Sequence, residues 1–543
     1  MTNAVERLDY RELSSYKPLF LDYVYQYQRL EPFFSGDIHQ PSAWLRAAEA
    51  VSAYPRPVRE LAPILREKNA RLGGDEAVMR TIDSVEKGAL AIVTGQQVGL
   101  MGGPLYSLYK ALTAVELARR AGSRLGRDVV AIFWMDADDH DFEEVSSFSL
   151  IDAAQELTTL RYEPPGPVQD LPVGNLRLET PISSVVAEMG DRLPPSEFKT
   201  SVLEALTESY RPGKTLADAF GAWLLRMSAG TGLAVIDPTA PSVKSLARAV
   251  FQREIATAGE SSRRVAETTA LLVAQGYHAQ ADAPEDRLNL LYADPTRSPI
   301  AIESGSFRLP FRREVVTANE LERLVGEQPE RFSGSVLLRS IVQDHLLPTL
   351  AYVAGPNEIA YLAQLGGVYE HFGVPRPLVA PRASLTLVEK PAAKFLRRHE
   401  LKLGELRAND ESALNRILKD LAPPELDEDL ARARTCIQEI TLTLEKDLKS
   451  IDPTLGSAAR STRGKLLHQI EELEAKGRRA LKKNNETLRR QFLNTRTSVF
   501  PDFEMQERKL SAVHYYAKYG WYLTEMIRES IDLEQQGHIL LYL

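Results

Sequence analysis

The sequence predicts an α/β protein with a parallel sheet at its core, insertions on that core and an α-helical coiled-coil hairpin. Three observations support this fold class. Two continuous apolar runs flank an amphipathic segment, three further apolar runs of the same kind follow, and a late stretch carries an apolar repeat. At 543 residues, the chain exceeds the size at which one hydrophobic core stops growing, so we expect more than one structural unit.

The first 88 residues predict a helical segment that packs on the core, because "SAWLRAAEAVSAY" and "VRELAPILREKNARL" carry apolar residues at helical spacing. The core itself is expected over residues 89–390. Its first two strands are the apolar runs at 89–95 and 129–139, and the segment between them begins with proline and ends with glycine, as helices do. This is a βαβ unit, whose parallel strands lie in the middle of a sheet.

Three more apolar runs, at residues 233–238, 349–355 and 377–381, stand next to helical patterns and predict further strands. Two insertions are expected, at about 140–230 and 277–316. In the second, short runs separated by Asp, Pro and Gly predict antiparallel strands. Thr317 and Glu320 have the spacing of a capping box, which begins a helix.

Residues 391–500 predict an α-helical coiled-coil domain. Apolar residues recur there at steps of three and four, with one step doubled, at Leu426, Leu430, Ala433, Ile437, Ile440, Leu444 and Ile451. A break at 452–457 precedes a second helix at about 458–497, so the two form an antiparallel hairpin. Its apolar edges predict a homodimer, and residues 501–543 predict a helix that returns to the core.

The net charge of −8 and the pI near 5.8 argue against a nucleic-acid or anionic-membrane surface, both of which need a basic face. The start lacks the features of a signal peptide, and no apolar run approaches the length of a membrane span, so we expect a cytoplasmic protein that binds small molecules. The one cysteine, Cys436, excludes intrachain disulfides and CxxC motifs, and no nearby pattern activates its thiol.

The stretch "TGQQVGLMGGPLYSLYK", residues 94–110, has a glycine cluster between a predicted strand and a helix. It matches neither the dinucleotide-binding motif nor the P-loop. Its glycines either let a ligand approach the backbone or allow close packing of helix and strand. The candidate residues for binding a nucleotide or substrate here are Gly95, Gln96, Gln97, Gly99, Gly103 and Tyr106, with Lys110 as a catalytic candidate.

A second candidate cluster is "DADDHDFEE", residues 136–144, directly after a buried strand. Crowded carboxylates raise one another's pKa and favour a protonated histidine, which suits a general base or a cation site. The catalytic candidates are Asp139, His140 and Asp141, and Asp136 is a binding candidate. The spacing does not fit zinc, so we predict no metal site. The alternative is a hydrogen-bonded turn whose charges are solvated.

A third cluster lies at residues 339–365, where a glycine and a proline follow a predicted strand and a helix begins at the same sheet edge. The polar candidates for substrate binding are Gln343, Asp344, Gly355, Asn357, Glu358 and Tyr361, joined by Arg382 after the last predicted strand. For Asn357, a plain helix cap is an equally good interpretation.

The motifs "TGQQVGLMGGPLY", "FWMDADDHDFEEV" and "QDHLLPTLAYVAGPNEIAY", with the late "QERKL" and "YYAKYG", resemble the cysteine-adding enzymes of bacillithiol biosynthesis. The resemblance spans nearly the whole chain. It implies a Rossmann-like core similar to nucleotidyltransferases and class I synthetases, with a dimerising coiled coil. It also implies a ligase that adds L-cysteine to glucosaminyl malate in the last step of bacillithiol synthesis, by forming an amide bond.

Because a carboxylate is a poor acyl donor, we expect ATP or another nucleotide to activate the cysteine carboxylate, and a requirement for Mg²⁺ stays open. Lys110 and the backbone amides near Gly95 to Gly103 would stabilise negative charge, and His140 with Asp139 or Asp141 would accept the amine proton. Two alternatives remain: a non-catalytic nucleotide-binding scaffold with a coiled coil, and a nucleotidyltransferase that acts on another small acid.

Overall fold

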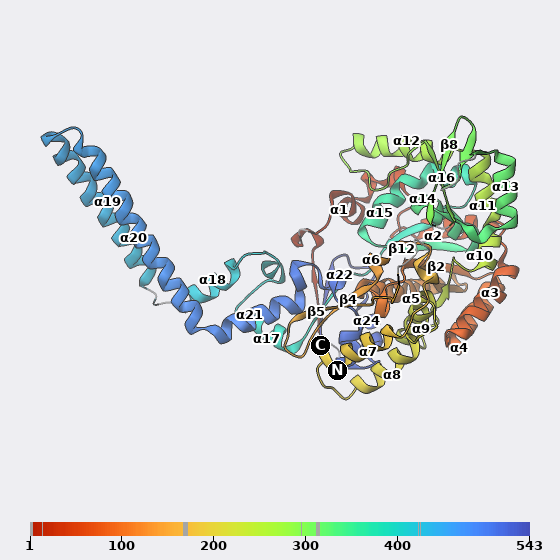
Figure 1. The fold of residues 1–543 in the computed structure, drawn as a ribbon, viewed down its shortest axis with the longest axis horizontal. Helices are drawn as coiled ribbons and strands as arrows, with labels where there is room; N and C mark the ends of the chain where they lie inside the picture. The colour runs from red at the N-terminus through yellow and green to blue at the C-terminus, as the bar shows by residue number, and fades with distance from the viewer. Residues whose placement is uncertain are drawn as a thin grey trace. The chain divides into compact units, whose positions relative to one another are not determined.

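The computed structural model describes residues 4–13, 15–166, 172–294, 296–310, 315–421, 423 and 425–543 (Figure 1). The chain divides into two compact units. Unit 1 comprises Met1–Leu387 and Met505–Leu543, and unit 2 comprises Val388–Glu504. None of the helices in these described ranges is long and apolar enough to cross a membrane.

The core of unit 1 is a five-stranded parallel sheet in the order β13-β12-β2-β3-β6. Its strands are β2 (Leu90–Gln97), β3 (Val129–Asp136), β6 (Ala234–Ile236), β12 (Thr349–Ala354) and β13 (Leu378–Pro381). All five predicted strands are confirmed. Numbered along the chain, their spatial order is 3-2-1-4-5, the Rossmann order, in which ligands bind where the order reverses, between β2 and β12.

Continuous apolar sequence makes these strands central, and helices cover them. Helix α5 (Leu105–Leu125) connects β2 to β3 and packs against both. It begins after Pro104 and ends at Gly126, which adopts a left-handed conformation with φ of +64°. Of the predicted N-terminal helices, α2 (Pro41–Ala53), α3 (Val58–Arg71) and α4 (Glu76–Glu86) pack against the sheet, whereas α1 (Pro18–Tyr25) packs against α15 (Pro356–Leu362).

The first predicted insertion contains an antiparallel hairpin of β4 (Ser147–Ile151) and β5 (Leu157–Arg161) after the short helix α6 (Phe142–Val145). Three helices follow before β6: α7 (Pro181–Arg192), α8 (Lys199–Ser209) and α9 (Leu216–Met227). Residues 167–171 of this insertion lie outside the described residues.

Between β6 and the next sheet lie α10 (Pro241–Leu246), α11 (Arg248–Ala256) and α12 (Glu260–Ala274). The second predicted insertion is an antiparallel sheet in the order β10-β9-β8-β7-β11. Its strands are β7 (Arg287–Ala293), β8 (Arg297–Glu303), β9 (Ser306–Arg308), β10 (Val315–Val316) and β11 (Phe332–Gly334). The prediction of antiparallel strands is confirmed, while residues 295 and 311–314 lie outside the described residues.

The predicted capping box is present at the start of α13 (Ala318–Glu327), where Thr317 and Glu320 bond to each other's backbone. Helix α14 (Val336–Leu346) then leads into β12. Two short helices, α15 (Pro356–Leu362) and α16 (Gly366–Phe372), lead from β12 to β13.

The sequence interpretation missed a small sheet of β1 (Val5–Leu8), β15 (His538–Tyr542) and β14 (Leu385–Val388). Residues 501–543, expected as one helix, form α22 (Gln506–Lys509), α23 (Val513–Tyr519) and α24 (Leu523–Ser530) before β15. Because β1 pairs with β15 at the other end of the chain, no local sequence pattern predicts either strand.

Unit 2 is helical. Helices α19 (Leu426–Ile451) and α20 (Leu455–Asn484) lie side by side as a long hairpin (Figure 1), followed by α21 (Glu486–Val499) and preceded by α17 (Lys390–Arg398) and α18 (Ser412–Lys419). Glu445 on α19 accepts a hydrogen bond from Arg460 of α20 at 2.7 Å. The predicted coiled-coil hairpin is confirmed, and the break is shorter than expected because α20 already begins at Leu455.

Candidate active site

A cavity of about 660 Å³ lies at the carboxyl ends of β2, β3 and β12, where the strand order reverses. Its other wall comes from β7, β8 and the start of α14. The structure brings together at this cavity most of the residues singled out from the sequence: Gly95, Gln96, Gln97, Tyr106, Lys110, Asp136, Asp139, Gly355, Asn357, Glu358, Tyr361 and Arg382. Three strand ends that are distant in sequence thus form one pocket.

Lys110, on α5, lines the cavity, and only 3% of its side chain is exposed. Its Nζ donates to the carbonyl oxygen of Gly95 at 2.6 Å and to Oε1 of Gln96 at 3.1 Å. It also forms an ion pair with Glu358. Burial lowers the pKa of Lys110, and the Glu358 carboxylate opposes this shift. A buried cation held by fixed acceptors is suited to stabilise negative charge at one point.

Glu358 fixes the turn between β12 and α15. Its Oε2 accepts the backbone N–H of Gly355 at 2.7 Å, and its Oε1 accepts the hydroxyl of Tyr352 at 2.8 Å. The first turn of α15 is therefore capped by its own Glu358, not by Asn357. The N-cap of α15 is Gly355, so the helix-cap interpretation does not apply to Asn357, which lines the cavity.

Arg339 on α14 is the second buried cation of the site, with 12% of its side chain exposed. It donates to the hydroxyl of Tyr361 at 3.1 Å and to Oε1 of Gln343 at 3.2 Å. Its Nε lies 3.9 Å from the Asp136 carboxylate. Burial raises the pKa of Asp136, and Arg339 only partly offsets this. A carboxyl with a raised pKa that reaches a cavity is a candidate general base.

The glycine cluster resolves into two roles. Gly95 and the glutamines after it line the cavity, whereas Gly99 and Gly103 do not. A Cβ on Gly99 would lie 2.8 Å from Cα of Gly103, and Gly103 has a φ of +68°. Gly99 and Gly103, which were expected to bind ligand, lie outside the cavity lining, and the structure supports close packing within the turn for both.

The acidic cluster is only partly in the cavity. Burial would raise the pKa of Asp139, but hydrogen bonds from the Gln97 side chain at 2.5 Å and from the backbone N–H of His140 at 2.7 Å outweigh it, so the pKa of Asp139 is lowered. His140 does not line the cavity, and 46% of its side chain is exposed, with Nδ1 3.5 Å from Asp139. Asp141 caps α6 by accepting the N–H of Glu144 at 3.1 Å. The expected grouping of His140 and Asp141 with the other site residues is corrected.

Gln343 and Asp344 lie behind the cavity and not in its lining. Both are 1% exposed. Asp344 accepts hydrogen bonds from the side chain of Gln343 at 2.8 Å and from the hydroxyl of Tyr369 at 2.5 Å. These two residues support α14 from the core side, and neither reaches the cavity where the sequence placed them as substrate-binding candidates.

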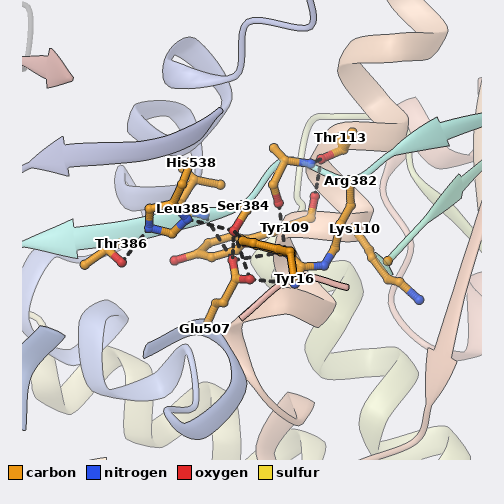
Figure 2. A network of polar contacts seen from close by, with 12 residues as sticks. Tyr16, Tyr109, Lys110, Thr113, Arg382, Ser384, Leu385, Thr386, Glu507 and His538 are labelled. Atoms are coloured by element: carbon orange, nitrogen blue, oxygen red, sulfur yellow. Dashed lines mark hydrogen bonds and ion pairs between the residues drawn. The ribbon is translucent and has the colours of Figure 1, made fainter. Parts of the chain in front are cut away.

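Arg382 reaches the cavity from the end of β13 and is held by the C-terminal segment (Figure 2). Its guanidinium donates to both oxygens of Glu507, at 2.6 and 3.0 Å, and the two side chains are 4% and 2% exposed. Glu507 also accepts from the hydroxyl of Ser384 at 3.0 Å and the N–H of Leu385 at 3.0 Å. Ser384 in turn contacts Nδ1 of His538 at 2.8 Å, so the last strand of the chain is tied to the cavity wall.

Two family models match the chain consecutively. Residues 4–383 match "Bacillithiol biosynthesis BshC, N-terminal Rossmann-like domain", and residues 385–543 match "Bacillithiol biosynthesis BshC, C-terminal coiled-coil domain". The chain belongs to the BshC family.

Relatives within the BshC family match over the full length. Proteins named "Putative cysteine ligase BshC" are 34% identical in Salinibacter ruber, covering 99% of both chains, and 32% identical in Koribacter versatilis, covering 94% of both. A solved chain titled "putative arginyl t-RNA synthetase" from Campylobacter jejuni aligns with a TM-score of 0.23 and 11% identity, over 81% of this chain and 93% of that chain. That likeness is too weak to bear on the fold or the site.

Several cavity residues of this BshC-family chain were missed from the sequence. They lie on the insertion sheet or just before it, at the start of α14, on β12 or in the C-terminal segment: Asp282, Arg287, Asn289, Arg297, Ser335, Arg339, Tyr352 and Arg508. Arg339 is the first residue of the third candidate cluster, 339–365, and its position one turn into a helix before β12 was the available signal. The insertion residues had no such signal, because only the folded chain places that sheet over the strand ends.

Proposed function

We propose that this cavity is the active site of a ligase that joins the carboxylate of L-cysteine to the amine of glucosaminyl malate. The observation that carries the proposal is that Lys110, Arg339 and the Asp136 carboxylate line one cavity at the carboxyl edge of the parallel sheet. The names of the BshC relatives agree with a cysteine ligase. A pure scaffold has no need of such a cluster.

The charge of the cavity suits acidic substrates. Six basic side chains line it, Lys110, Arg287, Arg297, Arg339, Arg382 and Arg508, against four acidic ones, Asp136, Asp139, Asp282 and Glu358. The excess of positive charge complements the two carboxylates of a malate group or the phosphates of a nucleotide. Basic side chains concentrated here contrast with the net charge of −8 for the whole chain.

The residues present also fit a nucleotide as co-substrate. Gly355 lines the cavity at the start of α15, next to Arg382, and Gly95 lines it at the end of β2 near Lys110. Gly95, Gly355, Lys110 and Arg382 would hold the phosphates. Bound ATP would supply the leaving group that the cysteine carboxylate lacks.

The amine of the sugar must lose a proton as the amide forms. Asp136 is placed for this step, because it reaches the cavity and its raised pKa makes it a better proton acceptor than an ordinary carboxylate. We therefore assign the proton to Asp136 in preference to His140. Lys110 would stabilise the negative charge on the carbonyl oxygen.

Binding measurements test this assignment before any turnover. Calorimetric titration of glucosaminyl malate into the wild type and Arg339→Met should give a Kd at least about tenfold weaker for the variant, because a cation near the acidic group is lost. Arg323→Met, on the exposed face of α13, is the control that removes one positive charge elsewhere. Equal affinity for all three proteins would contradict the proposed site. A nucleotidyltransferase that acts on another acid would instead release pyrophosphate without cysteine.

A further inference from the structure

Glu254, on α11, is a buried carboxyl behind the cavity wall that the proposed chemistry does not use. It is 0% exposed. Its oxygens lie 2.9 and 2.8 Å from the hydroxyl of Ser261, and Oε1 accepts the backbone N–H of Asn289 at 2.8 Å. Within the described ranges no ion pair involves Glu254. A carboxylate that is buried without a counter-charge lowers the stability of the folded chain, so we looked for a role of Glu254 in its hydrogen bonds.

The main hydrogen-bond partner of Glu254 outside its own helix and α12 is Asn289, on β7. The pairing of β7 with β8 shifts register between Arg287 and Leu291, so Asn289 falls outside that ladder and its N–H bonds to Glu254 instead. Its side chain donates to the hydroxyls of Ser261 at 2.9 Å and Ser262 at 3.0 Å. Glu254 therefore holds Asn289 in two ways. It accepts the backbone N–H of Asn289, and it accepts the hydroxyl of Ser261, which in turn accepts from the Asn289 amide.

Asn289 in turn fixes the start of α14. Its carbonyl accepts the N–H of Ser335 at 2.8 Å, and its Oδ1 accepts the Ser335 hydroxyl at 3.1 Å. Ser335 is the N-cap of α14, and Arg339 lies one turn further along the same helix. Asn289, Ser335 and Arg339 all line the cavity. A continuous chain of hydrogen bonds thus leads from Glu254 to the residue before the helix that carries Arg339.

The charge state of Glu254 decides how this chain is bonded. A serine hydroxyl has one proton, and with Glu254 ionised Ser261 donates it to the carboxylate and accepts from the Asn289 amide. If Glu254 is protonated, its own O–H donates to Ser261, whose hydroxyl proton loses its acceptor. Burial raises the pKa of Glu254 to about 7, partly offset by the hydrogen bonds of Asn289 and Ser261.

Charged groups on the elements around Glu254 bond elsewhere. The basic ones reach backbone carbonyls, a tyrosine hydroxyl or other carboxylates: Lys244, Arg248, Arg253, Arg263, Arg264, Arg287, Arg323, Arg339 and His345. The acidic ones on these elements are Glu260, Glu267, Glu320, Glu322, Glu327 and Asp344. The pKa of Glu254 is therefore raised by burial and lowered only by the hydrogen bonds from Asn289 and Ser261.

We propose that Glu254, as a carboxylate, is a positioning residue for the cavity: it holds Asn289 and Ser335, and through them the start of α14 that presents Arg339. Protonation loosens this wall, so the cavity is best formed above neutral pH. The effect on turnover rests on the proposed function, whereas the effect on the wall itself does not.

Hydrogen–deuterium exchange of the full-length protein tests the wall directly. Exchange of peptides spanning 286–293 and 333–340 is compared at pH 6 and pH 8, after correction for the intrinsic pH dependence, in the wild type, Glu254→Gln and Glu327→Gln, the last being an exposed glutamate on α13. We expect protection in the wild type to fall by about tenfold at pH 6, protection in Glu254→Gln to be low at both values, and Glu327→Gln to follow the wild type. Protection that does not change with pH in the wild type would overturn the proposal, as would a Glu254→Gln variant that follows the wild type.

Kinetics supply the second readout. Because Arg339 binds the acidic substrate, KM for glucosaminyl malate should rise about tenfold from pH 8 to pH 6 in the wild type while kcat changes less, and Glu254→Gln should remove this pH dependence. A change in kcat alone would count against positioning. If no product forms under any condition, the proposed function fails and the exchange experiment alone decides the role of Glu254.

Discussion

Arg382 donates two hydrogen bonds to the carboxylate of Glu507, although 125 residues separate them in the sequence. Burial would raise the pKa of Glu507, but the Arg382 guanidinium outweighs it and holds that pKa below its usual value. Arg382 lines the cavity and Glu507 does not. The C-terminal segment is thus part of the support of the site.

Replacing Glu507 by Ala should leave the Arg382 charge buried without its partner. Removing one member of a buried ion pair costs about 3–5 kcal/mol, and we expect a loss of this size in the free energy of unfolding of unit 1. Tryptophan fluorescence in urea measures it selectively, because all four tryptophans, Trp44, Trp134, Trp223 and Trp521, lie in unit 1.

The exposed Glu529 is the matched control for Glu507, because it lies in the same C-terminal segment. Glu529→Ala should change the free energy of unfolding by less than about 0.5 kcal/mol. A loss below about 1 kcal/mol for Glu507→Ala would mean that the ion pair with Arg382 does not hold the segment.

Asp136→Asn should lower kcat by about 10²-fold or more, because the proton acceptor is lost while the shape of the side chain is kept. His140→Ala is the informative comparison. The sequence favours His140 as the proton acceptor, whereas the structure leaves its ring outside the cavity lining. Steady-state rates on folded variants decide between them. An active Asp136→Asn with an inactive His140→Ala would reverse the assignment.

Glu254 links pH to stability with a definite sign. Its pKa is raised from 4.5 to about 7 in the folded chain, so its contribution to stability is fully present below pH 4.5 and is lost as the pH rises through 7. The shift corresponds to roughly 3 kcal/mol. The wild type should therefore lose about this much stability, relative to Glu254→Gln, between pH 5 and pH 8. Urea unfolding of both proteins at the two pH values measures it, and an unchanged difference would contradict the shift.

The hairpin of α19 and α20 carries apolar side chains that unit 2 leaves exposed, among them Ile440 at 55% and Ile451 at 76%. We expect a second copy of the chain to cover this face. Ile440→Glu places a charge there and should convert a dimer to a monomer in light scattering, with unit 1 still folded. Cys436→Ser, an exposed site on the same helix, should leave both mass and activity unchanged. A monomeric wild type would refute the dimer.

Most of the core could be predicted from the sequence because its signals are local. Each strand of the parallel sheet is a continuous apolar run that ends in a turn, and Thr317 with Glu320 has the spacing of its helix start. Strand β1 carried no such signal. Its four residues pair with β15 more than 500 positions away, and long-range pairing leaves no periodic pattern in a short segment.

The residues of the cavity likewise divide into those with a local sequence signal and those placed only by tertiary packing. Lys110, Asp136 and Glu358 follow predicted strands, so the edge rule for parallel sheets brought them together correctly. Asn289 and Arg297 come from an insertion whose docking over that edge depends on tertiary packing. His140 was misplaced relative to the cavity because the chain leaves the sheet edge after Asp139, and sequence proximity to Asp136 does not imply a shared direction.

The central claim is that the cavity makes an amide bond between cysteine and glucosaminyl malate. Purified protein incubated with L-cysteine, glucosaminyl malate and ATP is analysed by mass spectrometry for bacillithiol and for AMP or ADP, with Lys110→Met and Cys436→Ser in parallel. We expect bacillithiol with a stoichiometric nucleotide product in the wild type and in Cys436→Ser, and a rate at least about 10²-fold lower in Lys110→Met. Absence of product with ATP and with every other nucleoside triphosphate, or full activity in Lys110→Met, would contradict it.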